Sequence, residues 1–256
     1  MPVRRVCFLL ALAAAAVPAQ LRDCPGISID GYKVMLDNVR VSGAKTEDAL
    51  LLLNRLRQKM QFDLTAIQLE TIPQTVLVPC RDRTPQDVTD FNPTIVDSLN
   101  GHRVLVEVWG QVEARTGLSM QRAQLNFTLV PVSFYDRPVV PAGGFSAAYQ
   151  QRLRGNPDDL AKLFGEFSDL KSYVSVAAGV KSLKEHEYDQ AYLCFCRADS
   201  LLRQPAANLE PAVKASLLRY LEQKVNDTFA QAHNDKSVKS RLALAGTRSA
   251  CPGALP

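Results

Sequence analysis

The segment of residues 103–132 alternates apolar and polar side chains, and this pattern limits the possible folds more than any other feature of the chain. A two-residue period suits an extended strand, because successive side chains of a strand point to opposite faces. The interruption at Arg115–Gly117 predicts the turn of an antiparallel hairpin with one face at least partly in water. One face carries Val104, Val106, Val108 and Val112, the other Glu107, Gln111, Glu113, Leu105 and Trp109, and after the turn Ala123, Leu125, Phe127 and Leu129 alternate with polar residues.

The rest of the first half mixes strand and helix patterns. Residues 27–42 have a period near two, with a break at Gly31, and residues 75–80 form another short apolar run. A helix is predicted from Thr46 to about Met60, where apolar side chains share one stripe, and a shorter helix over 93–99. These elements predict a small α/β domain, sandwich-like in its layers, over residues 20–136.

The sequence pattern of the second half predicts helices. Residues 137–143 contain prolines and glycines and are interpreted as a linker, followed by a helical domain over 144–233 and a flexible tail over 234–256. The expected fold class is therefore α+β. Helices are expected over 144–154, 157–169, 170–184, 188–203 and 209–231, with no further strand.

The first residues resemble an export signal. Arg4 and Arg5 precede an apolar run from Val6 to Val17, and small residues follow at Val17–Ala19. The run is shorter than the about 20 residues needed to cross a bilayer, so cleavage is expected rather than anchoring. We therefore expect a signal peptide over 1–19, a periplasmic or secreted bacterial protein, and no transmembrane segment in the mature chain.

The cysteines and the net charge bear on the compartment and on the kind of partner that we expect. Without Cys7, five of the six cysteines remain, and a Cys24–Cys80 disulfide is one expectation for an oxidising compartment. Cys194 and Cys196 are interpreted as small buried side chains, and the pairing of Cys251 stays open. Without Arg4 and Arg5 the 30 basic residues become 28, against 26 acidic ones, which gives no reason to expect nucleic acid as a partner.

Motifs for catalysis are missing from the sequence. The three histidines, His102, His186 and His233, stand outside any catalytic or metal-binding motif, so no enzyme activity, cofactor or metal is expected. An alternative is a cell-wall hydrolase that uses Asp82 or Asp87 with Glu107. Another is a sugar or peptide site around Trp109 and Glu107, unless Trp109 packs under a helix instead.

Gly179, Tyr188, Ala191, Phe195 and Ala198 form a pattern of small and large residues over 179–205 that resembles a tetratricopeptide repeat. Small and large residues follow the spacing of that repeat, with Pro205 near the closing proline, although no second copy precedes it at the expected interval of 34 residues. The resemblance implies a helical hairpin used for protein contacts, in which small residues let two helices approach closely.

The first half is similar to the small periplasmic α/β domains of TolB-like and curli-secretion-like envelope proteins. The nearest points are Gly110–Val112 and Ala123–Leu125 in the predicted hairpin, while the middle strand-helix unit of those domains has no counterpart. Together the two resemblances imply a non-catalytic adaptor or assembly protein with a protein partner in the cell envelope. The residues expected to bind are Trp109, Glu107, Tyr188 and Tyr192.

Overall fold

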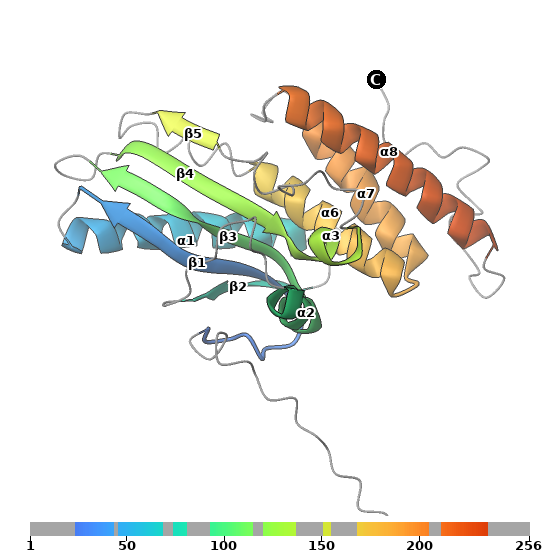
Figure 1. Ribbon diagram of the computed structural model, residues 1–256, viewed down its shortest axis with the longest axis horizontal. Coiled ribbons are helices and arrows are strands. Elements are labelled where there is room, and N and C mark those ends of the chain that lie inside the picture. Colours follow the sequence, from blue (N-terminus) through green and yellow to red (C-terminus); the bar gives the residue numbers. More distant parts are fainter. Residues whose placement is uncertain are drawn as a thin grey trace, which may run out of the picture.

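The computed structural model describes residues 24–43, 46–68, 74–80, 93–114, 120–136, 151–154, 168–204 and 211–234. These residues form a five-stranded sheet with helices against it, which confirms the α+β class (Figure 1). The strands are β1 (Tyr32–Ser42), β2 (Thr75–Pro79), β3 (Val104–Ala114), β4 (Met120–Leu129) and β5 (Gln151–Arg154). The helices are α1 (Thr46–Gln68), α2 (Pro93–Gly101), α3 (Val130–Tyr135), α6 (Ser168–Lys184), α7 (Tyr188–Arg203) and α8 (Pro211–Asn234).

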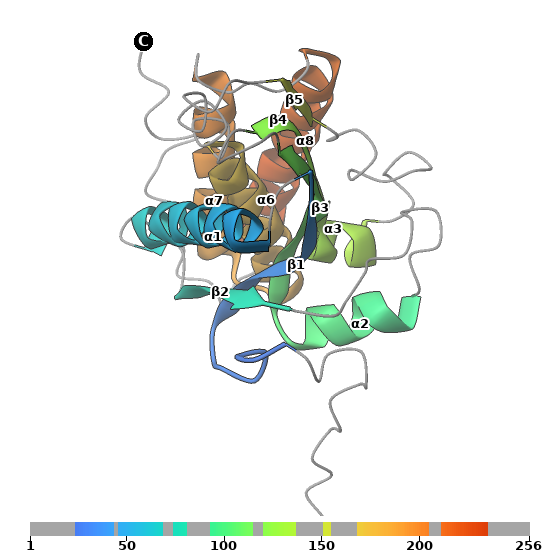
Figure 2. The ribbon, with the colours of Figure 1, turned by 90° about the vertical axis from the view of Figure 1, so that its left-hand side faces the viewer.

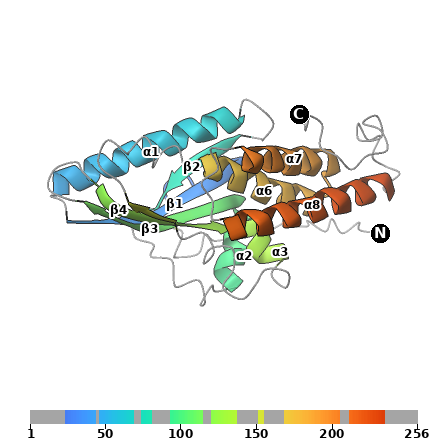
Figure 3. The same cartoon turned by 90° about the horizontal axis from the view of Figure 1, so that it is seen from above.

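The sheet is mixed, with the strand order β2-β1-β3-β4-β5. Strand β1 runs parallel to both β2 and β3, whereas β3-β4 and β4-β5 are antiparallel pairs. Neighbouring parallel strands need a crossover connection. Helix α1 connects β1 to β2, and α2 connects β2 to β3. The two helices consequently lie on opposite faces of the sheet (Figures 2 and 3).

The predicted hairpin is confirmed. Strands β3 and β4 pair in a register that sets Val108 opposite Phe127 and Val112 opposite Ala123. The predicted turn at Arg115–Gly117 lies outside the described residues. The expectation of a wet polar face is wrong at Glu107, whose side chain is 0 % exposed. Its register partners on the neighbouring strands, Met35 of β1 and Thr128 of β4, are buried as well, so the sheet is covered on this face around Glu107.

Several predicted boundaries need correction. Helix α1 continues to Gln68, beyond the expected end near Met60, and β1 begins only at Tyr32. Gly31 before it has φ +102°, and a Cβ there would lie 2.6 Å from the carbonyl oxygen of Gln74. The prediction of a helix over 144–154 is wrong at residues 151–154, because they form β5 on the edge of the sheet.

Two groups of buried residues hold these elements together. The main core fills one face of the sheet and runs without interruption from β1 and β3 through α6 and α7 to α8. The predicted linker 137–143 lies outside the described residues, but the sheet and the helices on either side of it share this one core. The second core lies on the other face, against α2, and comprises Cys24, Ile27, Met35, Val78, Cys80, Val96, Leu99, Val104 and Val130.

The helices α6, α7 and α8 form a separate layer beside the sheet (Figure 1). Helix α7 packs between α6 and α8, and α6 also contacts β3 and β4. The small residues predicted to permit close packing, Ala191 and Ala198, are both completely buried. No helix in the described ranges has the length and apolar character required to cross a membrane.

Candidate functional site

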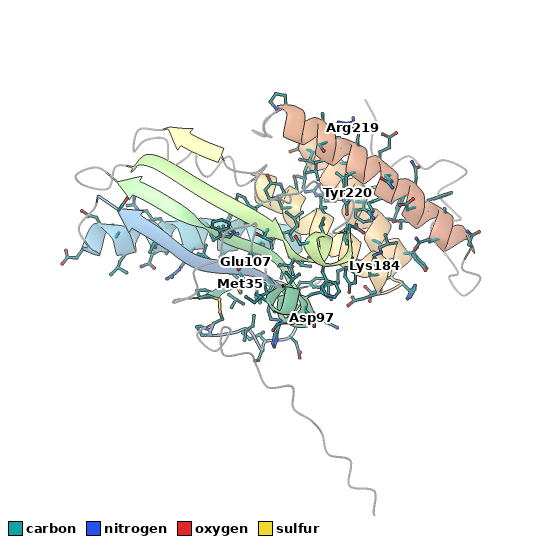
Figure 4. All side chains as sticks on the ribbon, viewed as in Figure 1. Met35, Asp97, Glu107, Lys184, Arg219 and Tyr220 are labelled. Carbon is teal, nitrogen blue, oxygen red and sulfur yellow. A yellow bond between two sulfur atoms is a disulfide. The ribbon has the colours of Figure 1, made fainter. Side chains whose placement is uncertain are left out.

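Only one of the two residues of the predicted ligand site on the sheet is accessible to solvent. Trp109 is partly buried on β3, and its indole N–H donates a hydrogen bond to Thr128 Oγ1 across the hairpin at 3.4 Å. Glu107 precedes it by two residues on the same face but has no contact with solvent. Figure 4 shows Glu107 close to Met35 within the sheet. A sugar or peptide could therefore reach Trp109 but not Glu107 in this arrangement.

The hydrolase alternative meets the same obstacle. A carboxylate that protonates a glycosidic bond must touch the substrate. Glu107 is fully buried, and Asp82 and Asp87 lie outside the described residues. The alternative stays a prediction, and the geometry of Glu107 gives it no support.

The two tyrosines expected to bind a partner belong to the main core. Tyr188 is 7 % exposed and Tyr192 2 %, and burial raises the pKa of Tyr192. The Tyr188 hydroxyl forms a 2.9 Å hydrogen bond with Nδ1 of His186 in the turn before α7. Both rings stabilise the packing of α7, and neither is presented to a partner in this structure.

A buried polar cluster, which we call the junction cluster, lies where α3, α6 and α8 meet. Its centre is Asp136, 5 % exposed, which directly follows α3. The Tyr220 hydroxyl donates to Asp136 Oδ2 at 2.6 Å, and Lys224 Nζ lies 2.8 Å from the same oxygen. Lys184 Nζ lies 4.0 Å from Oδ1. Figure 4 shows Lys184 and Tyr220 on the helical side of the molecule.

A second set of hydrogen bonds extends the junction cluster to α2. Lys181 Nζ lies 3.4 Å from the backbone oxygen of Asn100 and 3.1 Å from Glu185 Oε1. The Asn100 side-chain amide donates to the Tyr135 hydroxyl at 3.3 Å. Each ammonium group of the cluster thus has an oxygen partner, as buried charges require. This arrangement connects α2, α3, α6 and α8 through buried polar contacts.

Sequence reasoning missed the junction cluster. Tyr220 and Lys224 are one helical turn apart on α8, a spacing that puts two side chains on one face. Their partner Asp136 is 84 positions away from Tyr220 in the chain. The local spacing was available as a signal, but nothing in it identifies so distant a carboxylate.

Another buried lysine lies at the start of β1 and contacts the turn between α2 and β3. Lys33 is 3 % exposed, and its ammonium group donates to the backbone oxygens of Gly31 at 3.0 Å and His102 at 2.9 Å. Burial, with a smaller contribution from Arg103, lowers the pKa of Lys33. Burial and the nearby Lys33 lower the pKa of His102 as well. These contacts join the start of β1 to the turn before β3.

The cysteines in the described part of the chain are either disulfide-bonded or free. Cys24 and Cys80 form the expected disulfide between the first described turn and the end of β2. Cys194 is a buried free thiol whose pKa burial raises to about 12. The interpretation of Cys196 as a simple buried side chain is wrong, because it is disulfide-bonded. Within the described ranges, no three His, Cys, Asp or Glu side chains are grouped to hold a metal ion.

Among the described residues, the two most exposed large apolar side chains belong to α1. Phe62 is 68 % exposed, Leu50 57 % and Leu51 42 %. Leu51 and Phe62 are about three helical turns apart and so share one side of the helix. Met60 and Leu64 on the opposite side are 0 % exposed within the main core. Helix α1 thus presents large apolar side chains to solvent while its inner side holds it on the sheet.

Comparisons with protein-family models, with curated proteins and with solved structures found no match for this chain.

Proposed function

We propose that the protein is an exported, non-catalytic adaptor of the bacterial cell envelope that binds a protein partner through the outer side of α1. The observation that carries the proposal is the exposure of Leu50, Leu51 and Phe62 on this one helix. Large apolar side chains gathered on a surface are typical of interaction sites, because their exposure to water costs free energy that a partner recovers.

The shape of α1 favours a helix-in-groove contact. In that mode one side of an amphipathic helix inserts apolar side chains into an apolar groove of the partner. Arg55 and Gln58 are exposed between Leu51 and Phe62 and can hydrogen-bond at the rim of such a groove. The inner side of α1 is already held by Met60 and Leu64, so binding does not require the helix to fold first.

Two features support an exported protein. The disulfide Cys24–Cys80 and the bonded state of Cys196 suit an oxidising compartment, where such bonds persist. The basic and apolar residues before Pro18 have the pattern of a secretory signal. In this proposal the layer of α6, α7 and α8 supports the sheet, which α6 contacts directly.

A photo-crosslinking experiment tests the proposal. A photoreactive phenylalanine analogue replaces Phe62 or Leu51 in the full chain, which is expressed with its natural leader and irradiated in cells. The expected result is one discrete adduct from both positions that weakens when unmodified protein is overexpressed as competitor. Arg55→Glu in the Phe62-labelled chain should reduce the adduct severalfold, because it changes the rim of the same surface.

The matched control is the same analogue at Leu193, which is 43 % exposed on α7. The proposal requires that this position give no such adduct. Equal crosslinking from Leu193 and Phe62, or no adduct from α1 at all, would show that α1 is not a specific binding surface.

A further inference from the structure

The disulfide of Cys196 requires a partner that the rest of the described chain does not contain. Among the described cysteines, Cys24 is bonded to Cys80 and Cys194 is a free thiol, yet Cys196 is disulfide-bonded. The two other cysteines of the sequence are Cys7 and Cys251, both outside the described residues. One of these two has to supply the second sulfur if the bond lies within one chain.

Cys251 is the residue that fits an exported chain. Cys7 lies within the apolar run that follows Arg4 and Arg5, in the segment expected to be removed on export. We infer that Cys196 and Cys251 form the second disulfide of the mature protein, and that this bond holds the C-terminal segment 235–256 against α7.

The length of that segment permits the bond. Helix α8 packs along α7 and ends at Asn234, and the chain from there to Cys251 can span about 3.3 Å per residue when extended. Cys196 itself is 7 % exposed, so a partner sulfur must approach a nearly closed surface of α7.

The neighbouring Cys194 does not compete for the bond. It is two residues away on the helix and so faces in a different direction, into the core. Its thiol is buried with a pKa near 12, and the thiolate is the species that attacks a disulfide. Cys194 therefore stays reduced while Cys196 reacts.

The oxidation needs an electron acceptor, which we assign to a dithiol-disulfide oxidoreductase of the export compartment. The thiolate of Cys251 or Cys196 attacks the disulfide of that enzyme and forms a mixed disulfide. The other cysteine of the pair displaces the enzyme thiolate. The protein loses two protons and two electrons, and the enzyme disulfide is reduced to a dithiol.

Peptide mapping of the exported full chain tests this pairing. After alkylation of free thiols in denaturant, trypsin should release Glu185–Arg197 joined to Ser249–Pro256, with one alkyl group on Cys194. The link should vanish in Cys251→Ser and Cys196→Ser and persist in Cys194→Ser, which is the matched control. Cys251→Ser should also lower the Tm measurably relative to Cys194→Ser.

Other outcomes overturn the pairing. An alkylated Cys251 in the wild-type chain would show that the tail is not bonded. A link from Ser249–Pro256 to Cys194, or from Cys196 to Cys7, would assign the bond to other residues. A dimer on non-reducing gels that Cys196→Ser abolishes would make the bond intermolecular. None of these results depends on whether α1 binds a partner, so they leave the proposed function to its own test.

Discussion

Gly179 of α6 lies directly against the aromatic ring of Phe195 on α7. A Cβ at Gly179 would be 2.6 Å from Cε1, 2.7 Å from Cδ1 and 3.0 Å from Cζ of that ring. Both residues belong to the closely packed pair of helices that the spacing of small and large residues predicted. The absence of a side chain at this position lets the ring fill the space between the two helices.

Gly179→Ala should therefore destabilise the protein despite the better helix propensity of alanine. The ring is completely buried and cannot move aside without disturbing its neighbours. Overpacking of this kind costs about 1–3 kcal/mol, partly offset by about 1 kcal/mol of helix propensity. Urea denaturation followed by circular dichroism measures the difference in the free energy of unfolding.

Gly101→Ala is the matched control, since nothing lies within 4 Å of a Cβ at that position near the end of α2. Its free energy of unfolding should stay within about 0.5 kcal/mol of wild type. Phe195→Leu should recover part of the loss when combined with Gly179→Ala, because the smaller side chain leaves room for the new methyl group. Equal effects of the two glycine substitutions would contradict the proposed contact.

The junction cluster predicts a large effect from the removal of one ammonium group. Lys224→Met leaves the buried carboxylate of Asp136 with the Tyr220 hydroxyl and the more distant Lys184. The loss of the nearest cation from a buried carboxylate should lower the free energy of unfolding by about 3 kcal/mol. Chemical denaturation measures this loss, and adding Asp136→Asn should restore part of it.

The ion pair between Arg203 and Asp199 provides the comparison. Arg203 donates to Asp199 at 2.7 and 2.9 Å, but its side chain is 63 % exposed. Arg203→Gln should cost less than about 1 kcal/mol. If both substitutions cost the same, burial would not be the reason for the stability of the junction cluster.

The buried thiol of Cys194 predicts a loss of stability at alkaline pH. Its pKa is raised from 9.0 to about 12 by burial in the folded chain. Below pH 9 the thiol is protonated in both states, so its contribution is fully present. Between pH 9 and 12 only the unfolded chain releases the proton, so stability falls by up to about 1.4 kcal/mol per pH unit.

Comparison with Cys194→Ala isolates this effect from tyrosines that titrate in the same range. The free energy of unfolding of wild type should fall more steeply with pH than that of the variant. Iodoacetamide at pH 8 should leave Cys194 of the folded chain unmodified and label it in denaturant. Rapid labelling of the native thiol would show that Cys194 is accessible.

The local sequence pattern was sufficient to predict the helices and strands whose periodicity is strong. The ends of α7 at Tyr188 and Arg203 match the prediction, and the β3-β4 hairpin follows from its alternation. Strand β5 was missed because four residues are too few to show a period, and its extended state depends on pairing with β4. Its sequence alone does not distinguish it from a short helix.

The candidate sites were less predictable, since they depend on distances between parts of the chain. Alternation placed Glu107 on a polar face, but only the packed sheet shows that this position has no solvent contact. The spacing of Tyr188 and Tyr192 indicated that they share one face of a helix, but it did not show that this face packs into the main core. The outer side of α1 was missed because the helix was expected to end before Phe62.

The disulfide Cys24–Cys80 predicts how the first described turn is held. Both sulfurs belong to the second core, and the bond links residues 56 positions apart. Restricting a loop of that length in the unfolded chain is worth roughly 4 kcal/mol in the chain-entropy description. Cys24→Ala with Cys80→Ala should lower the free energy of unfolding by about 2–5 kcal/mol. The free energy of unfolding should also fall more steeply with urea concentration, since a less restricted unfolded chain exposes more surface.

Denaturation without reductant measures both quantities, with Cys194→Ala as the variant that removes a buried sulfur but no bond. An unchanged midpoint in the double variant would mean that the other residues of the second core hold the turn without the bond.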